Sequence, residues 1–146
     1  MQYFEDLAVG QKFDSGRLTV NADEIKEFAS RFDPQPFHLD DAAAKSSLFG
    51  GLAASGWHTA AMTMRLIVGG EFRPAGGILG FGGELAWLKP VRPGDELRAE
   101  SEVLETRESR SRPGEGLVKV RVTTLNQHGE AVQTFTPTLL VRRRAG

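Results

Sequence analysis

The chain has 146 residues, of which 40% are hydrophobic and 25% charged, and its formal net charge is −1. These values predict one soluble globular domain, 1–146, with a core of its own. The near-neutral charge argues against nucleic acid as a bulk electrostatic partner. The absence of cysteine excludes disulfides, thiolate chemistry and Cys-based metal sites.

Signals for membrane insertion and export are missing from the sequence. No apolar run approaches the ~20 residues that a membrane span needs. The first ten residues, Met1–Gly10, lack the basic-then-apolar pattern of a signal peptide. We therefore expect no membrane partner and a cytoplasmic location.

The first part of the chain predicts a strand followed by an amphipathic helix. The strand is Lys12–Val20. Asn21 is suited to cap the N–H groups of a helix that runs to about Asp33, before Pro34. The apolar face of this helix recurs at helical spacing and consists of Ile25, Phe28, Ala29 and Phe32.

The stretch Phe32–Asp41 holds a carboxylate and an imidazole five positions apart. Proline fixes φ and restricts the residue before it, so the segment from Asp33 to Pro36 is expected to be extended. An extended segment can present Asp33 and His38 to one cavity, as acid–base work on a water molecule requires. The alternative is a proline-rich surface loop in which an Asp–His hydrogen bond only fixes the chain.

A nearly all-apolar helix follows a short helix at Asp40–Ser47. It lies between Ala53 and Gly69, and apolar residues on both of its sides predict a buried helix. The remaining segments predict antiparallel strands: Gly77–Leu88, Leu97–Val103, Val118–Thr123 and Ala131–Val141. Pro137 predicts an edge or a bulge in the last strand. Wrapping a meander of three or four such strands around the helix would bury both.

This order of elements resembles the hot-dog fold, and three segments resemble the MaoC-like dehydratases and R-specific enoyl-CoA hydratases. They are Asp33–His38, Phe49–Gly56 and the turn Lys89–Asp95. The turn is shared by many hot-dog proteins, so the first segment is the more specific one. Family members typically read Gly-Asp-x-Asn-Pro-apolar-His there. Here Phe32 replaces the glycine and Gln35 the asparagine, whereas Asp33, Pro36 and His38 match.

The resemblance covers about Phe4 to Val141 and implies an α+β fold class. It implies a single hot-dog domain in which a curved antiparallel sheet wraps a long central helix. The implied activity is that of a hydro-lyase, which reversibly hydrates a 2-enoyl-CoA thioester to a 3-hydroxyacyl-CoA. No separate cofactor is expected, since coenzyme A is part of the substrate, and fatty acid metabolism is the expected setting.

Three residues are the catalytic candidates: the resemblance implies Asp33 and His38, and the place of Gly56 at a helix start adds the third. Asp33 and His38 would act on the water, and either can be the proton acceptor. The backbone N–H of Gly56, at the start of the central helix, would stabilise the negative charge on the thioester oxygen. The alternative for Gly56 is a glycine that only permits tight helix packing.

Four neighbouring residues are candidates for contact with the acyl-CoA substrate: Ser55, Phe37, Trp57 and His58. Ser55 also suits the N-cap of the central helix, and the aromatic residues also suit the core. A metal site built from the histidines and nearby aspartates lacks a regular ligand spacing and is not expected. Basic residues that can meet the coenzyme A phosphates are Arg65, Arg73, Arg92 and Arg142–Arg144. The three terminal arginines equally suit a solvated tail.

Two other functions remain open beside the hydro-lyase. Many hot-dog thioesterases place a carboxylate on the central helix, and Ala53–Gly70 contains no Asp or Glu. A non-catalytic acyl-CoA-binding subunit has no need of both Asp33 and His38. A lone domain of this kind leaves strand edges open, and we expect a homodimer or a larger even-numbered assembly with the substrate at the dimer interface.

Overall fold

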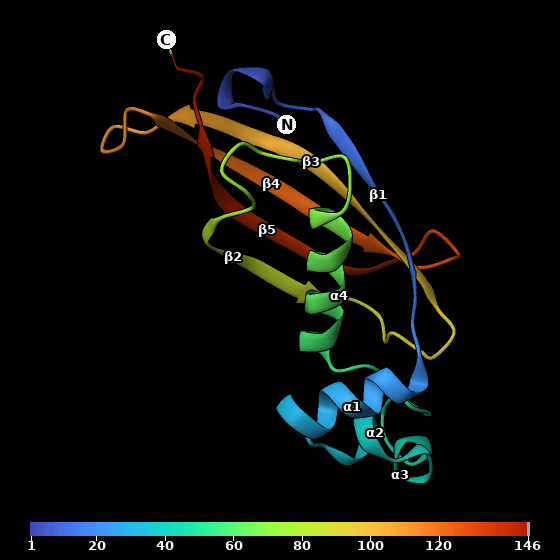
Figure 1. The fold of residues 1–146 in the computed structure, drawn as a ribbon. Helices are drawn as coiled ribbons and strands as arrows, with labels where there is room; N and C mark the ends of the chain where they lie inside the picture. Colours follow the sequence, from blue (N-terminus) through green and yellow to red (C-terminus); the bar gives the residue numbers. More distant parts are fainter. Residues whose placement is uncertain (146) are drawn as a thin grey trace.

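The computed structural model describes residues 1–145, which form a five-stranded antiparallel sheet with a long helix packed across it (Figure 1). The strands are β1 (Lys12–Thr19), β2 (Gly80–Trp87), β3 (Glu96–Glu108), β4 (Glu115–Leu125) and β5 (Ala131–Arg142). The helices are α1 (Ala22–Phe32), α2 (Pro36–Leu39), α3 (Asp41–Lys45) and α4 (Gly56–Val68), after a 3-10 turn at Phe4–Asp6. This architecture confirms the α+β class and the central helix against a sheet. Gly146, the last residue of the expected domain, lies outside the described part.

The strand order in the sheet is β1-β3-β4-β5-β2. The expected meander is confirmed for β3, β4 and β5, and buried and outward-facing residues alternate along β3 and β4. In β4, for example, Val118 and Val120 are fully buried while Lys119 between them is exposed. However, β2 does not pair with the strand that follows it. It lies at the far edge against β5, so β1 and β2 are the two edge strands.

Pro137 lies inside the sheet at an irregularity rather than on an edge. It faces Gly83 of β2, next to a shift in the register of the β2–β5 pair. A Cβ atom at Gly83 would lie 2.6 Å from the Cα of Pro137, so the two backbones approach each other as closely as only glycine allows. The irregularity lies opposite Pro137, but its extra residue is in β2 rather than in the last strand, where the proline had predicted a bulge.

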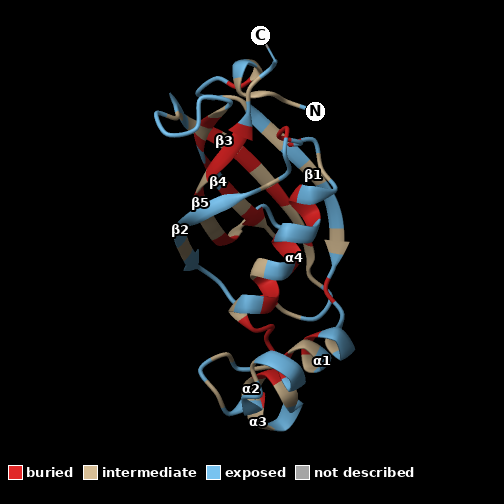
Figure 2. Ribbon diagram, turned by 60° about the vertical axis from the view of Figure 1, so that its left-hand side comes forward, coloured by how far each residue is buried: buried red, intermediate tan, exposed pale blue. Residues whose placement is uncertain are grey.

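The helix α4 is buried on one side only, which corrects the expectation of burial all round. Its buried residues face the sheet or α1: His58, Thr59, Met62, Thr63, Leu66 and Ile67 (Figure 2). On its other side Trp57, Met64 and Val68 are 60%, 39% and 57% exposed. The apolarity of this second side is thus not used within the chain. No helix within residues 1–145 has the length and apolarity that a membrane-crossing segment requires.

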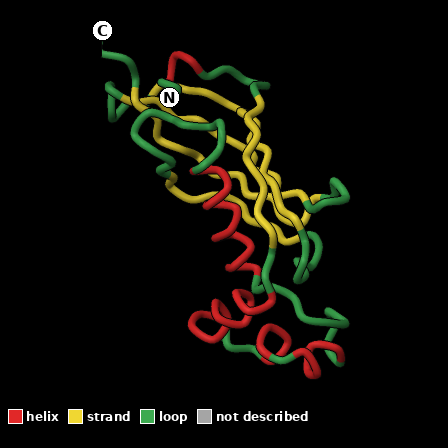
Figure 3. The backbone as a smooth tube through the Cα atoms, turned by 45° about the vertical axis from the view of Figure 1, so that its right-hand side comes forward, coloured by secondary structure: helices red, strands yellow, loops and turns green. Residues whose placement is uncertain are grey.

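The three short helices gather at one end of the molecule, beside the N-terminal end of α4 (Figure 3). As predicted, the Asn21 side chain caps α1, accepting hydrogen bonds from the N–H groups of Asp23 and Glu24 at 2.8 and 3.2 Å. Asp40 caps α3 in the same way through the N–H of Ala42. Both chain termini lie at the opposite end (Figure 1), so the helical end is the part of the fold that brings the Asp/His segment to α4.

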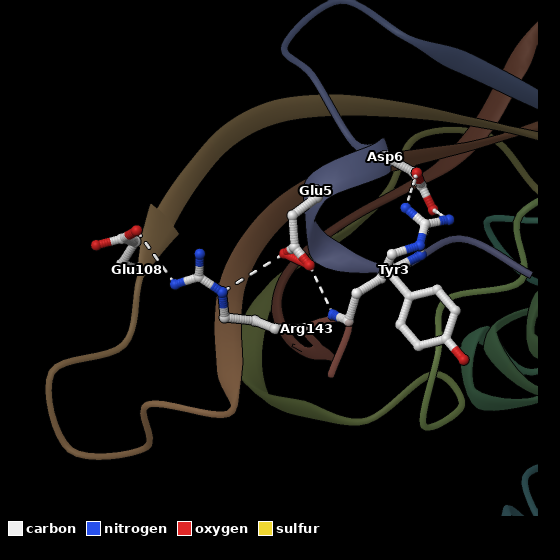
Figure 4. A network of polar contacts seen from close by, with 6 residues as sticks. Tyr3, Glu5, Asp6, Glu108 and Arg143 are labelled. Carbon is white, nitrogen blue, oxygen red and sulfur yellow. Dashed lines mark hydrogen bonds and ion pairs between the residues drawn. The ribbon is translucent and has the colours of Figure 1, made fainter. Parts of the chain in front are cut away.

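The C-terminal arginines bind the N-terminal turn instead of forming a free solvated tail (Figure 4). The Arg144 guanidinium donates to both carboxylate oxygens of Asp6, at 2.7 and 2.8 Å. Arg143 pairs with Glu108 at 3.1 Å and with Glu5 at 3.5 Å. These contacts hold the two ends of the chain together, so neither guanidinium is an unpartnered group for coenzyme A phosphates.

Candidate active site

Asp33 is placed by the end of α1. Its N–H still donates to the carbonyl of Ala29 at 2.9 Å, and Pro34 prevents a further helical turn. The N–H of Gln35 donates back to the Asp33 carbonyl at 2.7 Å, and Pro36 begins α2. The extended segment predicted from Asp33 to Pro36 is therefore wrong except at Gln35, because the chain makes a tight turn around Pro34 and Pro36 is already helical. Proline is favoured at the first position of a helix, where its missing N–H would have no partner.

The short helix α2 carries His38 to the Asp33 carboxylate. The His38 Nε2 atom lies 3.4 Å from Oδ2 of Asp33, and the two side chains are 5% and 17% exposed. The rings of Phe37 and Phe49 surround the imidazole, with centroids 4.6 and 5.9 Å from it. The structure thus brings the predicted pair together in a mostly apolar setting.

The hydrogen bond on the far side of the imidazole determines its tautomer. Nδ1 of His38 lies 2.6 Å from the carbonyl oxygen of Ala53. A carbonyl oxygen can only accept, so Nδ1 carries the proton of the neutral ring. The lone pair of Nε2 is therefore directed toward the side where Asp33 lies. The Asp33 carboxylate and the unprotonated Nε2 of His38 are both hydrogen-bond acceptors. One water molecule can therefore donate an O–H group to each of them.

Two opposing influences act on the Asp33 carboxyl group. Partial burial is the largest influence and by itself raises the pKa. Polar contacts with the side chains of Gln35 and Ser55, and then the positive charge that His38 carries when protonated, outweigh it, so the pKa of Asp33 lies below its ordinary value. The Gln35 amide donates to Oδ1 at 2.5 Å. Asp33 is therefore an ionised acceptor at neutral pH.

The N-terminus of α4 lies against the same pair. Ser55 is fully buried and is the N-cap, as expected, with its Oγ accepting from the N–H of Trp57 at 3.2 Å. Within residues 1–145 the N–H of Gly56 donates to no acceptor. A Cβ atom at Gly56 would lie 2.4 Å from the indole of Trp87. Gly56 thus combines a free N–H at a helix start with a packing requirement.

A cavity of about 240 Å³ lies beside His38 and Gly56. Its lining includes His38, Phe49, Gly56, Thr59, Trp87 and Lys89. A larger hollow of about 580 Å³ lies between β2, β4, β5 and the loop after β3, and its lining contains neither the Asp/His pair nor Gly56. The smaller cavity is therefore the candidate active site, because it alone of the two is lined by His38 and Gly56. Asp33 is not among its lining residues, so of the predicted pair only His38 reaches the cavity wall.

The other predicted contact residues lie around this cavity rather than in it. Phe37 packs edge-on against His38. Trp57 is 60% exposed and packs edge-to-face on Trp87 at 5.1 Å, so it is not a core residue. His58 is buried and stacks on Phe28 of α1 at 4.7 Å, away from the cavity lining. Burial lowers the pKa of His58, against a weaker opposing influence of Glu24.

Trp87 and Thr59 are cavity residues that the sequence did not predict. Alternation along β2 indicates only that Trp87 shares a face with Leu85. The pairing of β2 with β5, and not with β3, is what carries the indole over the start of α4. Within residues 1–145 no group of three or more histidine, aspartate or glutamate side chains is arranged to hold a metal ion.

Residues 5–126 match the model of the MaoC-like domain family. The chain belongs to this family. The protein YdeM of Bacillus subtilis (strain 168) is 33% identical over 140 residues, covering 95% of this chain and 98% of YdeM. The mesaconyl-CoA hydratase of Cereibacter sphaeroides is 52% identical over 58 residues, but the match covers 40% of this chain and only 17% of that enzyme.

Solved structures agree with this membership. The MaoC-like dehydratase from Rhodospirillum rubrum has a TM-score of 0.97 and 56% sequence identity, with all of both chains covered. The R-hydratase PhaJ1 from Pseudomonas aeruginosa has a TM-score of 0.77 and 26% identity, covering 97% of this chain and 86% of that one. The resemblance to MaoC-like dehydratases and R-hydratases, and the hot-dog fold that it implied, are confirmed.

Proposed function

We propose that this MaoC-like protein is a hydro-lyase that reversibly adds water to a 2-enoyl-CoA thioester, giving a 3-hydroxyacyl-CoA. The observation that carries the proposal is the Asp33–His38 pair, whose Oδ2 and Nε2 atoms lie 3.4 Å apart beside a cavity that also touches Gly56. A depressed carboxyl pKa and an Nδ1–H imidazole give two acceptors for one water. Water addition and removal need such a pair.

In the hydration direction, the water oxygen bonds to the β-carbon of the enoyl group while Asp33 and His38 hold the molecule. The water gives up a proton to one of the two acceptors. The electron pair of the carbon–carbon double bond moves toward the thioester, whose oxygen gains negative charge. The acceptor then returns this proton to the α-carbon, the carbonyl is restored, and the Asp33–His38 pair is regenerated.

The start of α4 supplies the complementary charge for this step. The Gly56 N–H is free within the described chain and lies at the positive end of the α4 dipole. An N–H group aimed at an oxygen where charge develops stabilises the transition state more than the ground state. Gly56 is thus the proposed oxyanion donor, and Ser55 fixes the turn that presents it.

A coenzyme A thioester is proposed as the substrate because the chain shares a segment with an enzyme named mesaconyl-CoA hydratase. The cavity volume of about 240 Å³ suits a small acyl group. Phe37 packs against the imidazole, Trp57 packs on Trp87 of the cavity lining, and His58 stacks on Phe28 away from the cavity. Their proposed part is to shape the site rather than to perform the chemistry.

A homodimer is proposed as the active form. β2 is an edge strand with an unpaired side, and Leu79, Phe81 and Leu88, on and beside it, are 54%, 66% and 53% exposed. The contact between Trp57 and Trp87 brings this edge next to the exposed side of α4. Soluble proteins usually cover such edges, and a second copy with two-fold symmetry is the commonest means.

A two-signal assay tests the function. The protein is mixed with crotonyl-CoA and related enoyl-CoAs, and both the loss of conjugated thioester absorbance and the release of free thiol are followed. We expect absorbance loss without thiol release. Thiol release would instead indicate a thioesterase, although α4 contains no Asp or Glu. Binding without either signal would indicate a non-catalytic subunit.

A further inference from the structure

The turn before β3 aims one arginine into the loop beside the active site. Arg92, Pro93, Gly94 and Asp95 form this turn, which a hydrogen bond from the Asp95 N–H to the Arg92 carbonyl closes at 3.1 Å. Proline at the second position and a glycine with φ of 87° at the third suit such a turn. The Asp95 carboxylate accepts from the Arg92 N–H at 2.8 Å, which fixes the direction in which Arg92 leaves the backbone.

The Arg92 guanidinium binds backbone carbonyls of the loop between α3 and α4. It donates to Gly51 at 2.9 Å, to Phe49, and more weakly to Leu52 at 3.5 Å. This loop has no helix or strand to satisfy its carbonyl groups. A planar guanidinium can hold two carbonyls at once, which the point charge of a lysine cannot do in the same geometry.

The loop that Arg92 holds is also the surface on which His38 rests. The ring of Phe49 packs against the imidazole, and the carbonyl of Ala53 accepts the proton on its Nδ1 atom at 2.6 Å. On the other side of the loop, the N–H of Ala54 donates to the carbonyl of Val91 at 2.9 Å. Arg92 and Val91 therefore connect the loop that contacts His38, on both sides of Ala53, to the turn before β3.

We propose that Arg92 is a positioning residue that fixes the loop 49–53 against His38 and thereby keeps the imidazole in its Nδ1–H tautomer. Without the guanidinium, three carbonyls lose their donor and the Ala53 carbonyl loses its fixed place. The proton of the neutral ring then distributes over both nitrogens, and Nε2 no longer presents its lone pair to Asp33 in every molecule. Arg92 is thus occupied in the site and is not a coenzyme A phosphate ligand.

Nitrogen NMR of histidine-labelled protein tests this without any substrate. At a pH where the ring is neutral, wild-type His38 should show a protonated Nδ1 and an unprotonated Nε2, assigned by their loss in His38→Gln. In Arg92→Ala both signals should move toward the average of the two tautomers. Millimolar guanidinium should return them to the wild-type positions, because it can refill the space that the side chain leaves.

The matched control is Arg121→Ala, which removes a guanidinium that pairs with Glu102 on the sheet at 2.9 Å. It should leave the His38 signals unchanged, with or without guanidinium. If Arg92→Ala does not fold, Arg92→Lys tests the proposal instead, since lysine keeps the positive charge but lacks the planar guanidinium that holds two carbonyls at once. A folded Arg92→Ala or Arg92→Lys protein whose His38 signals match the wild type would overturn the proposal.

A kinetic measurement adds a second readout that rests on the proposed function. In Arg92→Ala the kcat for enoyl-CoA hydration should fall by roughly 10²-fold, the size expected for a displaced catalytic group, with KM changed much less. Guanidinium should restore part of kcat in this variant and not in Arg121→Ala. If the wild type hydrates no enoyl-CoA, the proposed function fails, while the NMR result still decides the role of Arg92.

Discussion

At the scale of single residues, the site depends on how Asp33 is kept ionised in a partly buried place. Burial raises its pKa, and the contacts from Gln35, Ser55 and His38 lower it by more. Gln35 is exposed, yet its amide lies 2.5 Å from the carboxylate. Gln35, which replaces the family's usual asparagine, therefore still helps to keep the Asp33 carboxyl group ionised.

Removal of this amide should raise the pKa of Asp33. In Gln35→Ala the raising influence of burial stays and one lowering contact is lost, so the carboxyl group should titrate at a higher pH than in the wild type. Carbon NMR of the Asp33 carboxyl group measures this directly. Gln127→Ala removes an amide from a different carboxylate, that of Asp95, and should leave Asp33 unchanged. An Asp33 pKa that is equal in Gln35→Ala and wild type would contradict this view of the site.

The sequence predicted the Asp/His pair but not the backbone acceptor that fixes the imidazole. Two residues five positions apart, with prolines between them, can be brought together by local chain geometry alone, and Asp33 and His38 are. The Ala53 carbonyl that sets the tautomer is 15 positions away and has no side chain to reveal it. Pro36 was expected to continue an extended segment, yet it starts α2, because proline is equally compatible with the first turn of a helix.

At the scale of elements, a buried polar network joins α4 to three strands. The Trp87 indole N–H donates to Oε1 of Gln133 at 3.0 Å, and the Gln133 amide donates to Oγ1 of Thr63 at 3.2 Å. The Thr63 hydroxyl donates to the carbonyl of Thr59 at 2.8 Å, so its 2.6 Å partner, Thr124, must be the donor in their contact. Thr63 is the shared acceptor at the centre of the network.

This order of donors and acceptors predicts that two threonine-to-valine substitutions reduce the free energy of unfolding by unequal amounts. Thr63→Val leaves both the Gln133 amide and the Thr124 hydroxyl without a partner, at roughly 1–3 kcal/mol of unfolding free energy for each buried group. Thr124→Val leaves Thr63 with its other two partners and should cost about 1 kcal/mol or less. Chemical denaturation of the two variants measures the difference. Equal losses, or a larger loss for Thr124→Val, would show that the donor order is wrong.

A second element-scale contact joins the chain termini through Arg144 and Asp6. The guanidinium lowers the pKa of the Asp6 carboxyl group, chiefly by hydrogen bonding. A carboxyl group whose pKa is lower in the folded protein than in the unfolded chain stabilises the fold at every pH above the unfolded-state pKa. This stabilisation is lost as the pH falls through the folded-state pKa. Arg144→Ala should therefore lower the melting temperature at pH 7 but change it little at pH 2. The difference at pH 7 should also shrink in 1 M salt, which screens exposed pairs. A loss of equal size at both pH values would contradict the ion-pair account.

Elements with a local signal were predictable, and their long-range pairing was not. Alternation placed β3 and β4 because each has one buried face, whereas β5 is buried at consecutive positions near its end. β2 has no such pattern, since most of its residues are exposed, and its position beside β5 depends on a crossover that local sequence does not encode. The apolarity of α4 correctly predicted a core helix, but it could not show that one side stays uncovered within a single chain.

At the scale of the whole molecule, the uncovered side of α4 and the β2 edge predict self-association. Sedimentation equilibrium at micromolar protein should give twice the chain mass of 15.9 kDa or an even multiple of it. Met64→Glu places a charge on the exposed side of α4 and should shift the equilibrium toward the monomer. Val9→Glu is the control, because Val9 is 66% exposed but lies in the loop before β1. An active monomer at dilutions where no dimer is present would contradict the proposed assembly.

In the proposed reaction, Asp33 and His38 together activate one water for addition to an enoyl thioester. The most direct test is the turnover of crotonyl-CoA by Asp33→Asn, by His38→Gln and by the double variant, each first shown to be folded. Loss of general acid–base assistance should lower the rate typically by about 10²–10⁴-fold in each single variant. The double variant should be little slower than either, because residues that act as one unit do not contribute additively. Near-wild-type turnover in either single variant would contradict the account.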